Sequence, residues 1–433
     1  MNKEISTIFN ITGFGAVPDG KTLCTAAFQA AVEACREHGG GTVYVPAGSF
    51  LTGSIHLISN TTLHLDAGAR ILFSQNPADF PIVQSRWEGE DSPVYSPLIF
   101  GDRVENVAVV GRGVLEGQGE SWWKLHHEKK LEYPRPRFIC FQNSSNILIE
   151  GVTLKDSPAW TINPILCDNV TVNKITIKNP ADSPNTDGIN PESCKNVHIS
   201  NCHVDVGDDC ITLKSGIEDC SVKVPCENIT VTNCTMVHGH GGVVIGSEMS
   251  GGVRNVTISN CVFEGTDRGI RIKSRRGRGG VVEDIRVNNI IMKDVLCPFV
   301  MHLFYFCGKN GKEKYVWDKN PYPVNESTPI FRRIHLSNIT ARNINAAAGY
   351  IYGLPEMPIE EITFDNISIS MAENPVPGMP AMMNDLEPMA GRGFICSYGK
   401  DITFSNVKIS NHQGPAFTVA HSEDVYVNGN RMD

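Results

Sequence analysis

The feature that most constrains the fold is a short frame that returns along most of the chain. The frame is a polar residue, Ile or Val, any residue, an apolar residue, any residue, and then usually Asn or Gly. Each copy alternates apolar and polar residues with a period of two, as a half-buried strand does, and its last residue suits a left-handed turn. The copies start at Asn106, Asn146, Asn169, Asn196, Asn228, Asn255, Asp284, Arg333, Glu361, Asp401 and Asp424.

The spacing of these copies indicates a solenoid. Most copies are 23 to 32 residues apart, and no helical pattern lies between them. Such a repeat predicts an all-β fold, a right-handed parallel β-helix of about ten to eleven coils, with successive strands about 4.8 Å apart. We expect a single domain over residues 1–433, in which residues 1–60 form an N-terminal cap and the first coil.

Two segments depart from the frame. Residues 22–38 place Ala27, Phe28, Ala31, Val32 and Cys35 at helical spacing before three glycines, which predicts a helix that caps the first coil. Residues 301–329 widen the gap between frames to 49 residues and are rich in aromatic side chains. We expect a loop excursion there, either a plain one or one that shapes a binding face.

Charge and hydropathy narrow the class of protein. The chain has 38 basic and 47 acidic residues, a net charge of −9, which disfavours broad nucleic-acid binding. No apolar run reaches the roughly 18 residues of a membrane span. The first residues lack the apolar core of a secretory signal, so we expect a cytoplasmic protein, or a secreted one if a leader was trimmed. No feature sets an oligomeric state.

The 14 cysteines follow the repeat. Cys202, Cys234 and Cys261 each lie six residues after a frame start, and Cys167, Cys194 and Cys226 each lie two residues before one. Such columns predict inward ladders of reduced, buried thiols rather than disulfides or metal ligands. The histidines are scattered and no C-x-x-C pair occurs, so we expect no metal and no cofactor.

Chemistry concentrates in four motifs on consecutive turns. They are Asn185-Thr186-Asp187-Gly188, Gly207-Asp208-Asp209-Cys210, Gly239-His240-Gly241-Gly242 and Arg271-Ile272-Lys273. Asp208 and His240 each lie twelve residues after a frame start, so they are expected to stack on neighbouring turns. Asp187 and Lys273 each lie eighteen residues after one, a weaker coincidence because the loops vary in length.

Three carboxylates without an evident metal cage favour general acid–base chemistry. Their mutual repulsion raises the pKa of one so that it stays protonated, as the acid of a glycoside hydrolase must. Arg271 and Lys273 beside them suit a sugar that carries its own carboxylate. Taken singly, each Asp fits a turn, and the Asp208–Asp209 pair fits calcium; taken together, their order favours a catalytic site.

The four motifs resemble those of family 28 glycoside hydrolases, the polygalacturonase family, whose members carry them in this order on a right-handed parallel β-helix. Phe14-Gly15-Ala16, residues 39–48, Gly117-Gln118-Gly119 and Ser157-Pro158 extend the resemblance over nearly the whole chain. The resemblance implies an enzyme that hydrolyses α-1,4-galacturonosyl linkages of pectic oligo- or polygalacturonate with inversion. Inversion implies carboxyl groups of acid and base about 6.5 to 9.5 Å apart.

The same resemblance implies roles for the catalytic side chains. Asp208 matches the general acid, and His240 matches the histidine that supports its protonation. Asp187 and Asp209 match the carboxylates that hold and deprotonate the attacking water, and which of the two is the base stays open because they titrate as a coupled set.

The substrate-binding roles also follow from the resemblance. Arg271 and Lys273 match the cations that bind the galacturonate carboxylate. Asn185, in the first motif, and Tyr305, in the strand after the Arg-Ile-Lys turn, match substrate contacts. The basic run 275–278 either extends these anionic subsites or is a solvated turn.

Residues 84–100 resemble an insertion of bacterial exo-acting members. Together with the missing signal, this favours release of single galacturonate units from the non-reducing end. The alternatives are endo cleavage, hydrolysis of rhamnogalacturonan or xylogalacturonan, a pectate-lyase-like reaction that uses calcium, and a β-helix that binds carbohydrate without catalysis.

Overall fold

The computed structural model describes residues 7–432. Residues 1–6, where the predicted cap begins and where a signal was sought, and residue 433 lie outside the described part. The chain divides into two compact units. The first unit comprises the residues up to Trp87 together with Asp91–Gly207, and the second comprises Glu88–Glu90 and Asp208–Asp433.

The first unit consists of stacked parallel strands. One ladder is β1 (Ile8–Asn10), β3 (Gly41–Val45), β6 (Thr61–Leu65), β11 (Glu105–Gly111), β14 (Ser145–Glu150), β16 (Asp168–Asn173) and β18 (Lys195–Ser200). A second is β2 (Asp19–Leu23), β4 (Gly48–Thr52), β7 (Ala69–Phe73), β12 (Val114–Glu116), β15 (Thr153–Lys155), β17 (Thr176–Lys178) and β19 (His203–Val206). A third is β5 (Ile55–His56), β10 (Ile99–Asp102) and β13 (Ile139–Gln142).

Other elements of the first unit lie outside these ladders. They are η1 (Ile11–Phe14), α1 (Thr25–Glu37), η2 (Pro77–Asp79), β8 (Ile82–Trp87), which pairs with β9 (Glu90–Tyr95), and α2 (Glu120–His127).

The second unit repeats this plan with longer strands. One ladder is β21 (Cys226–Thr232), β24 (Val253–Glu264), β26 (Val281–Lys293), β28 (Ile330–Ile344), β30 (Ile359–Met371), β32 (Gly399–Ser410) and β34 (Glu423–Val427), with β22 (Thr235–His238) on β24 and β35 (Asn430–Arg431) on β34. The other, the site ladder, is β20 (Asp209–Leu213), β23 (Gly241–Ile245), β25 (Arg268–Lys273), β27 (Cys297–His302), β29 (Ala347–Tyr352), β31 (Arg392–Ser397) and β33 (Gln413–Ala420).

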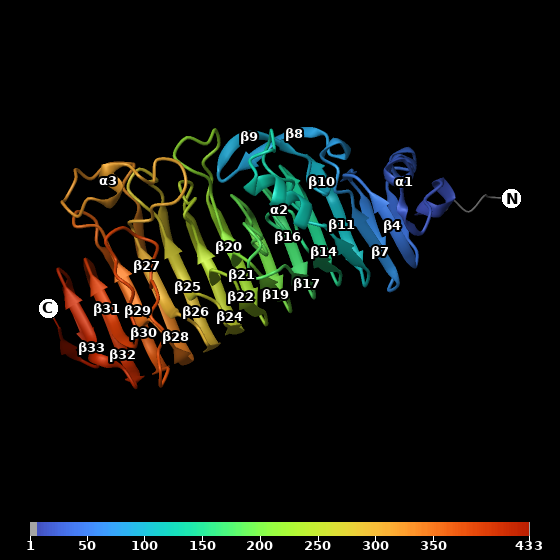
Figure 1. Cartoon of the computed structure of the whole chain (residues 1–433). Coiled ribbons are helices and arrows are strands. Elements are labelled where there is room, and N and C mark those ends of the chain that lie inside the picture. Colours follow the sequence, from blue (N-terminus) through green and yellow to red (C-terminus); the bar gives the residue numbers. More distant parts are fainter. Residues whose placement is uncertain (1–6, 433) are drawn as a thin grey trace. The chain divides into compact units, whose positions relative to one another are not determined.

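In Figure 1 the strands of each ladder follow one another in chain order. All eleven frame copies are strands, and the two apolar residues of each copy are buried. The parallel β-helix predicted from the frame is therefore confirmed. Three strands that precede the first copy, β1, β3 and β6, extend the ladder of the first unit toward the N-terminus.

The two ends of each frame copy bend the backbone. The sixth residue has a positive φ in every copy, as predicted; Asn233, for example, has φ 56°. The first residue is also left-handed in every copy, which the sequence pattern did not indicate; Asn228 has φ 59°. Asparagine tolerates this conformation better than most residues. On successive turns the amides also bond to one another, as Asn255 Nδ2 does to Asn228 Oδ1 at 3.1 Å.

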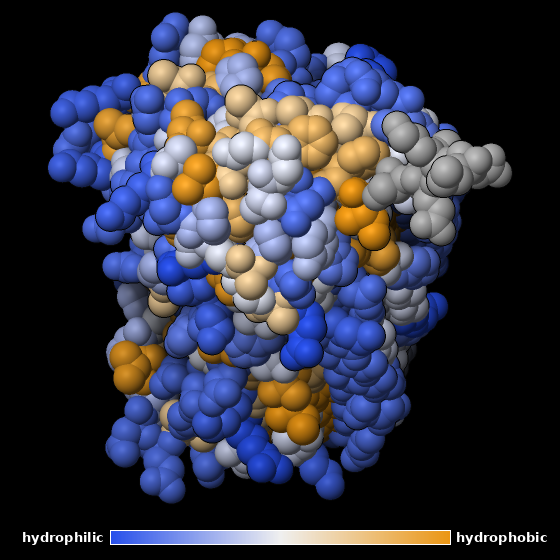
Figure 2. Space-filling model, turned by 90° about the vertical axis from the view of Figure 1, so that its right-hand side faces the viewer, coloured by the Kyte–Doolittle hydropathy of each residue, from blue (hydrophilic) through white to orange (hydrophobic). Residues whose placement is uncertain are grey.

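Helix α1 covers the first turns of the first unit. Its buried side chains are the five predicted ones: Ala27, Phe28, Ala31, Val32 and Cys35. The helix begins at Thr25 rather than at residue 22, because Asp19–Leu23 pairs as β2 with β4. Figure 2 looks onto this end, where hydrophilic residues surround smaller hydrophobic areas; the exposed apolar side chains of the first turn are Ile8, Phe14, Val17 and Leu23.

The predicted excursion begins slightly later than residue 301. Strand β27 continues to His302, and the chain returns to the ladder at Ile330. The excursion therefore covers residues 303–329 and contains one helical turn, α3 (Lys314–Trp317). No helix in residues 7–432 combines the length and the apolarity that crossing a bilayer requires.

The cysteines have the predicted state. All 14 are free and 13 are buried; Cys307 is half-buried. The buried thiols of Cys167, Cys194, Cys202, Cys226, Cys234 and Cys261 follow the repeat, as predicted.

The left-handed frame residues generate a stability prediction at Asn255 (φ 56°). Replacement by Gly removes the amide bond to Asn228 but keeps φ unstrained. Replacement by Val adds the cost of a β-branched residue at positive φ, about 1–2 kcal/mol. We expect Asn255→Val to lower the free energy of unfolding by about that much more than Asn255→Gly in urea titrations. Equal losses in the two variants would contradict the left-handed constraint.

Candidate active site

The register of the site ladder stacks the second and third motifs. Asp209 pairs with Gly241 on β23, so Asp208 and His240 occupy equivalent positions on neighbouring turns. His240 N donates to Asp208 O at 3.2 Å, and His240 Nδ1 lies 3.1 Å from Asp208 Oδ1. The predicted stacking of Asp208 and His240 is confirmed.

Asp209 is buried between two cations. Its Oδ1 lies 3.2 Å from Arg271 Nη1 and its Oδ2 lies 2.8 Å from Lys273 Nζ. The side chain of Asp209 is 3% exposed, that of Arg271 1% and that of Lys273 6%. The carboxylate is thus paired on both oxygens and withdrawn from solvent.

These cations decide the charge of Asp209. Burial alone would raise its pKa, because a buried carboxylate loses its hydration. The charges of Lys273, Arg271 and Lys214 outweigh burial and hold the pKa of Asp209 well below the ordinary carboxyl value. The surroundings of Asp209 therefore favour its ionised form.

His240 lies in an anionic environment. Its hydrogen bond with Asp208 raises the pKa of His240, burial opposes that, and the charges of Asp208, Asp209 and Asp267 raise it further. Because the imidazole and the Asp208 carboxylate are hydrogen-bonded, they form one acid–base pair that can carry a single proton between them.

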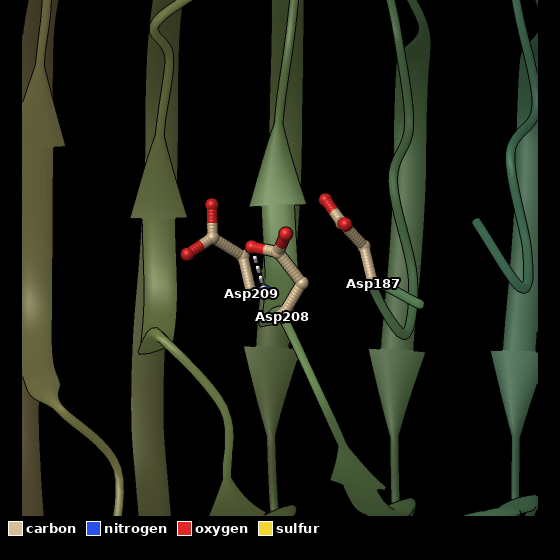
Figure 3. Close-up of side chains that lie close together, drawn as sticks. All are labelled: Asp187, Asp208 and Asp209. Carbon is tan, nitrogen blue, oxygen red and sulfur yellow. Dashed lines mark hydrogen bonds between the residues drawn. The ribbon is translucent and has the colours of Figure 1, made fainter. Parts of the chain in front are cut away.

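Figure 3 shows the carboxylates of Asp208 and Asp209 at the start of β20, with the bond from Asp209 N to Asp208 Oδ1, 2.9 Å long. Their carboxylate oxygens come within 4.8 Å. This distance joins the nearest oxygens of two neighbouring carboxylates, and the separation of about 6.5 to 9.5 Å between acid and base stays a prediction.

Arg271 and Lys273 were expected to bind a sugar carboxylate. In the structure, both contact Asp209, and Arg271 Nη2 contacts Met382 Sδ at 2.8 Å. Met382 belongs to the segment between β30 and β31, 111 residues further along the chain. No motif in the sequence connects that segment with the site, and the sequence analysis missed it.

Tyr305 lies against the same two cations. Its ring centroid is 5.8 Å from Arg271 Cζ and 5.0 Å from Lys273 Nζ. Tyr305 is not in the strand itself, because β27 ends at His302 and Phe304 pairs antiparallel with Arg275 as the chain leaves the ladder. Burial raises the pKa of Tyr305 well above its ordinary value, so its hydroxyl stays protonated.

Asn185 and Asp187 lie in the first unit, on the segment between β17 and β18. Asn185 is left-handed, with φ 53°, and its Oδ1 accepts from Arg135 Nη2 at 2.6 Å. The same guanidinium donates to the carbonyl oxygens of Pro158 and Pro184. Arg135 was missed by the sequence analysis, although the Ser157-Pro158 pair that it contacts was noted there.

Asp187 is 3% exposed, and its Oδ2 accepts from Asn190 Nδ2 at 2.9 Å. The preceding residue, Thr186, accepts through Oγ1 from Gly207 N at 3.3 Å. Gly207 is joined to Asp208 by one peptide bond. A hydrogen bond therefore joins the turn of Asp187 to Gly207, the first residue of the second motif.

The basic run after Lys273 has neither of the two expected roles. Arg275 and Arg278 are buried and share Glu218, and Arg276 pairs with Glu356. Arg278 and Arg275 outweigh burial and lower the pKa of Glu218 to about 2. The run is a buried ion-pair network that fixes the chain leaving β25.

Comparisons with known proteins identify the family of the chain. The model of the glycosyl hydrolases family 28 matches residues 35–379. A probable polygalacturonase of Vitis vinifera is 37% identical over 375 residues, which cover 84% of this chain and 74% of that protein. An endo-polygalacturonase of Pectobacterium carotovorum subsp. carotovorum is 32% identical over 305 residues, 66% of this chain and 73% of that protein.

Two solved structures share the fold. A hyperthermoactive exopolygalacturonase from Thermotoga maritima has a TM-score of 0.78 at 32% identity and covers 93% of this chain and 91% of that one. The family 28 exopolygalacturonase of Yersinia enterocolitica has a TM-score of 0.82 at 22% identity, covers 99% and 79%, and supports the fold alone. Because the family model spans the four motifs and most of the sequence, the chain belongs to glycosyl hydrolases family 28.

Proposed function

We propose that this glycoside hydrolase cleaves α-1,4 linkages between galacturonate residues of pectic chains, with inversion, and releases single units from the non-reducing end. The observation that carries the proposal is the contrast between two neighbouring carboxylates. Asp208 is hydrogen-bonded to the imidazole of His240, whereas Asp209 is ion-paired on both oxygens with Arg271 and Lys273. A glycosidase needs one carboxyl group of each kind.

In the proposed reaction, Asp208 protonates the glycosidic oxygen as the bond to the anomeric carbon breaks. His240 supplies the proton reserve, because the hydrogen-bonded pair holds one proton. A water molecule attacks the anomeric carbon and gives up its proton to a carboxylate. The products are a sugar with inverted anomeric configuration and the shortened chain.

We assign the base role to Asp187 and the orientation of the water to Asp209. A general base works best with a pKa near the working pH, whereas the two cations keep the pKa of Asp209 far below it. Asp187 lies one residue after Thr186, whose hydroxyl accepts from Gly207 N just before Asp208. The order of the motifs, which resembles that of family 28 members, supports the action of all three carboxylates on one bond.

Several observations support a uronate substrate and exo action. Lys273 and Arg271 are cations beside the reacting carboxylates, and Tyr305 covers them. In the first unit, a cavity of about 530 Å³ is lined by the aromatic Trp87 and Tyr133 and by His126, His127, Lys129 and Arg135. Arg135 ties this cavity to Asn185, and Trp87 ends the strand β8 of the predicted exo insertion. We propose that this cavity of the first unit binds a galacturonate residue of the substrate. The Thermotoga maritima structure, 32% identical, is that of an exopolygalacturonase.

Endo cleavage is the second candidate, because the Pectobacterium relative is an endo-polygalacturonase. The two modes differ in their first products. In a time course with trigalacturonate and long polygalacturonate, we expect the monomer as the first product, no increase in ultraviolet absorbance and no loss on chelation of divalent cations. Early mixed oligomers would establish endo action, and an absorbing product would overturn hydrolysis in favour of a lyase.

Asp208→Asn removes the proton donor while keeping the shape of the side chain. We expect kcat to fall by about 10²–10⁴, because that is the usual contribution of a general acid. Affinity for trigalacturonate, measured by calorimetry, should survive. Asp365→Asn, an isosteric change at an exposed position of β30, is the matched control. A kcat reduced less than tenfold would remove Asp208 from the role of acid.

Lys273→Met leaves Asp209 with a single cationic partner, so the pKa of its carboxyl group rises. Since Asp209 acts in its ionised form, we expect the acid limb of the pH profile of kcat/KM to move to higher pH. Lys273→Arg keeps the charge and should hold the limb close to its original place. If both variants lost the same fraction of activity at every pH, Lys273 would not act through the charge of Asp209.

A further inference from the structure

We infer that Asp267 is a positioning residue that holds His240 in its cationic form beside Asp208, an inference that rests on the function proposed above. No motif singles out Asp267. It lies twelve residues after the frame start at Asn255, the same offset as Asp208 and His240 in the two preceding copies.

The register of the site ladder supports this placement. Val243 pairs with Ile270, so three residues earlier His240 and Asp267 are equivalent. Asp267 N donates to Gly239 O at 2.9 Å. Neighbouring turns of a parallel ladder lie about 4.8 Å apart. Asp208, His240 and Asp267 thus occupy one position on three consecutive turns, with the imidazole in the middle.

The carboxylate of Asp267 is held in place by the guanidinium of the next residue, Arg268. Arg268 Nη1 lies 3.1 Å from Asp267 Oδ2, and the Arg268 side chain is only 6% exposed. The same guanidinium donates to Met379 O at 2.6 Å and to Pro380 O at 3.2 Å. Because Arg268 is fixed by main-chain carbonyls, it fixes Asp267, whose own side chain remains 45% exposed.

The imidazole of His240 and the carboxylate of Asp267 each keep one atom that can still form a hydrogen bond. His240 uses Nδ1 for Asp208, and within the described residues its Nε2 makes no hydrogen bond. Asp267 uses Oδ2 for Arg268, and in the same part of the chain its Oδ1 makes none. An imidazolium with carboxylates on the turns before and after it is stabilised from both sides.

The charged groups that face His240 in the second unit are the carboxylates of Asp208, Asp209 and Asp267. The nearby cations are already paired: Arg271 and Lys273 with Asp209, and Arg268 with Asp267. Asp267 adds its charge to those of Asp208 and Asp209, and it does so from the turn that follows His240.

The charge of Asp267 affects how readily the leaving group can be protonated. That proton passes from Asp208 to the glycosidic oxygen, and the Asp208–His240 pair takes another from solvent before the next cycle. Asp267 extends to higher pH the range in which the Asp208–His240 pair holds its proton. It touches neither substrate nor the reacting atoms and acts through His240.

The test compares pH profiles of kcat/KM on trigalacturonate for the wild type, Asp267→Asn and Asp267→Glu. We expect Asp267→Asn to move the alkaline limb of kcat/KM to lower pH by roughly 0.5–1 pH unit, because one carboxylate charge on the neighbouring turn is removed. The ratio of the wild-type kcat/KM to that of Asp267→Asn should therefore rise about three- to tenfold from the acid plateau to the alkaline side of the profile. Asp267→Glu should restore most of the limb, and Asp365→Asn is the control.

A uniform loss at every pH would overturn the inference, because it would mean that Asp267 only supports Arg268. A second measurement is independent of turnover: titration of the His240 ring protons by NMR in the wild type and in Asp267→Asn. Its pKa should fall in the variant, and an unchanged value would overturn the inference. If the wild type failed to cleave galacturonate oligomers, the proposed function would fall while this titration would still test Asp267.

Discussion

The rest of the structure depends on the in-register stacking of short strands whose two ends bend through left-handed residues. In each frame copy, the first and sixth residues have positive φ, so the strand between them has a fixed length and its apolar pair always points inward. A residue at a given offset therefore meets the residue at the same offset one turn later. The repeat alone therefore brings functional side chains together. Asp208, His240 and Asp267 lie on neighbouring turns because each is twelve residues after a frame start, although they belong to no common motif.

Within that frame, two consecutive carboxylates acquire opposite properties from their surroundings. Asp209 is closed in with Arg271 and Lys273, while the side chain of Asp208 is 20% exposed and bonded to an imidazole. This difference in surroundings needs no unusual group. It follows from which face of the ladder each side chain reaches and which side chains the next two turns offer there.

The features that could be predicted from the sequence are those that depend on the repeat of the frame or on helical periodicity. The frame strands, the buried cysteines, the capping helix and the stacking of Asp208 on His240 all follow from offsets or from helical spacing. What escaped prediction lies where the chain leaves the ladder. Met382 reaches Arg271 from 111 residues away, and Arg135 reaches Asn185 from a segment with no repeat. The burial of Arg275 against Glu218 depends on the same kind of long-range packing, which no local spacing encodes.

A gain in folding stability does not explain why Asp209, Arg271 and Lys273 form a buried ion-pair cluster. Removing three ionised groups from water is costly, and apolar residues of similar size often stabilise a fold equally well or better. The segment that covers Arg271 adds to that cost, because Met382 offers the guanidinium only a weak sulfur acceptor. What the arrangement does achieve is a carboxylate that is held in its charged form, with both oxygens paired, next to Asp208, the proposed acid. That property is of use only when a partly positive reaction centre and a polarised water lie next to it, as they do at the transition state of glycoside hydrolysis.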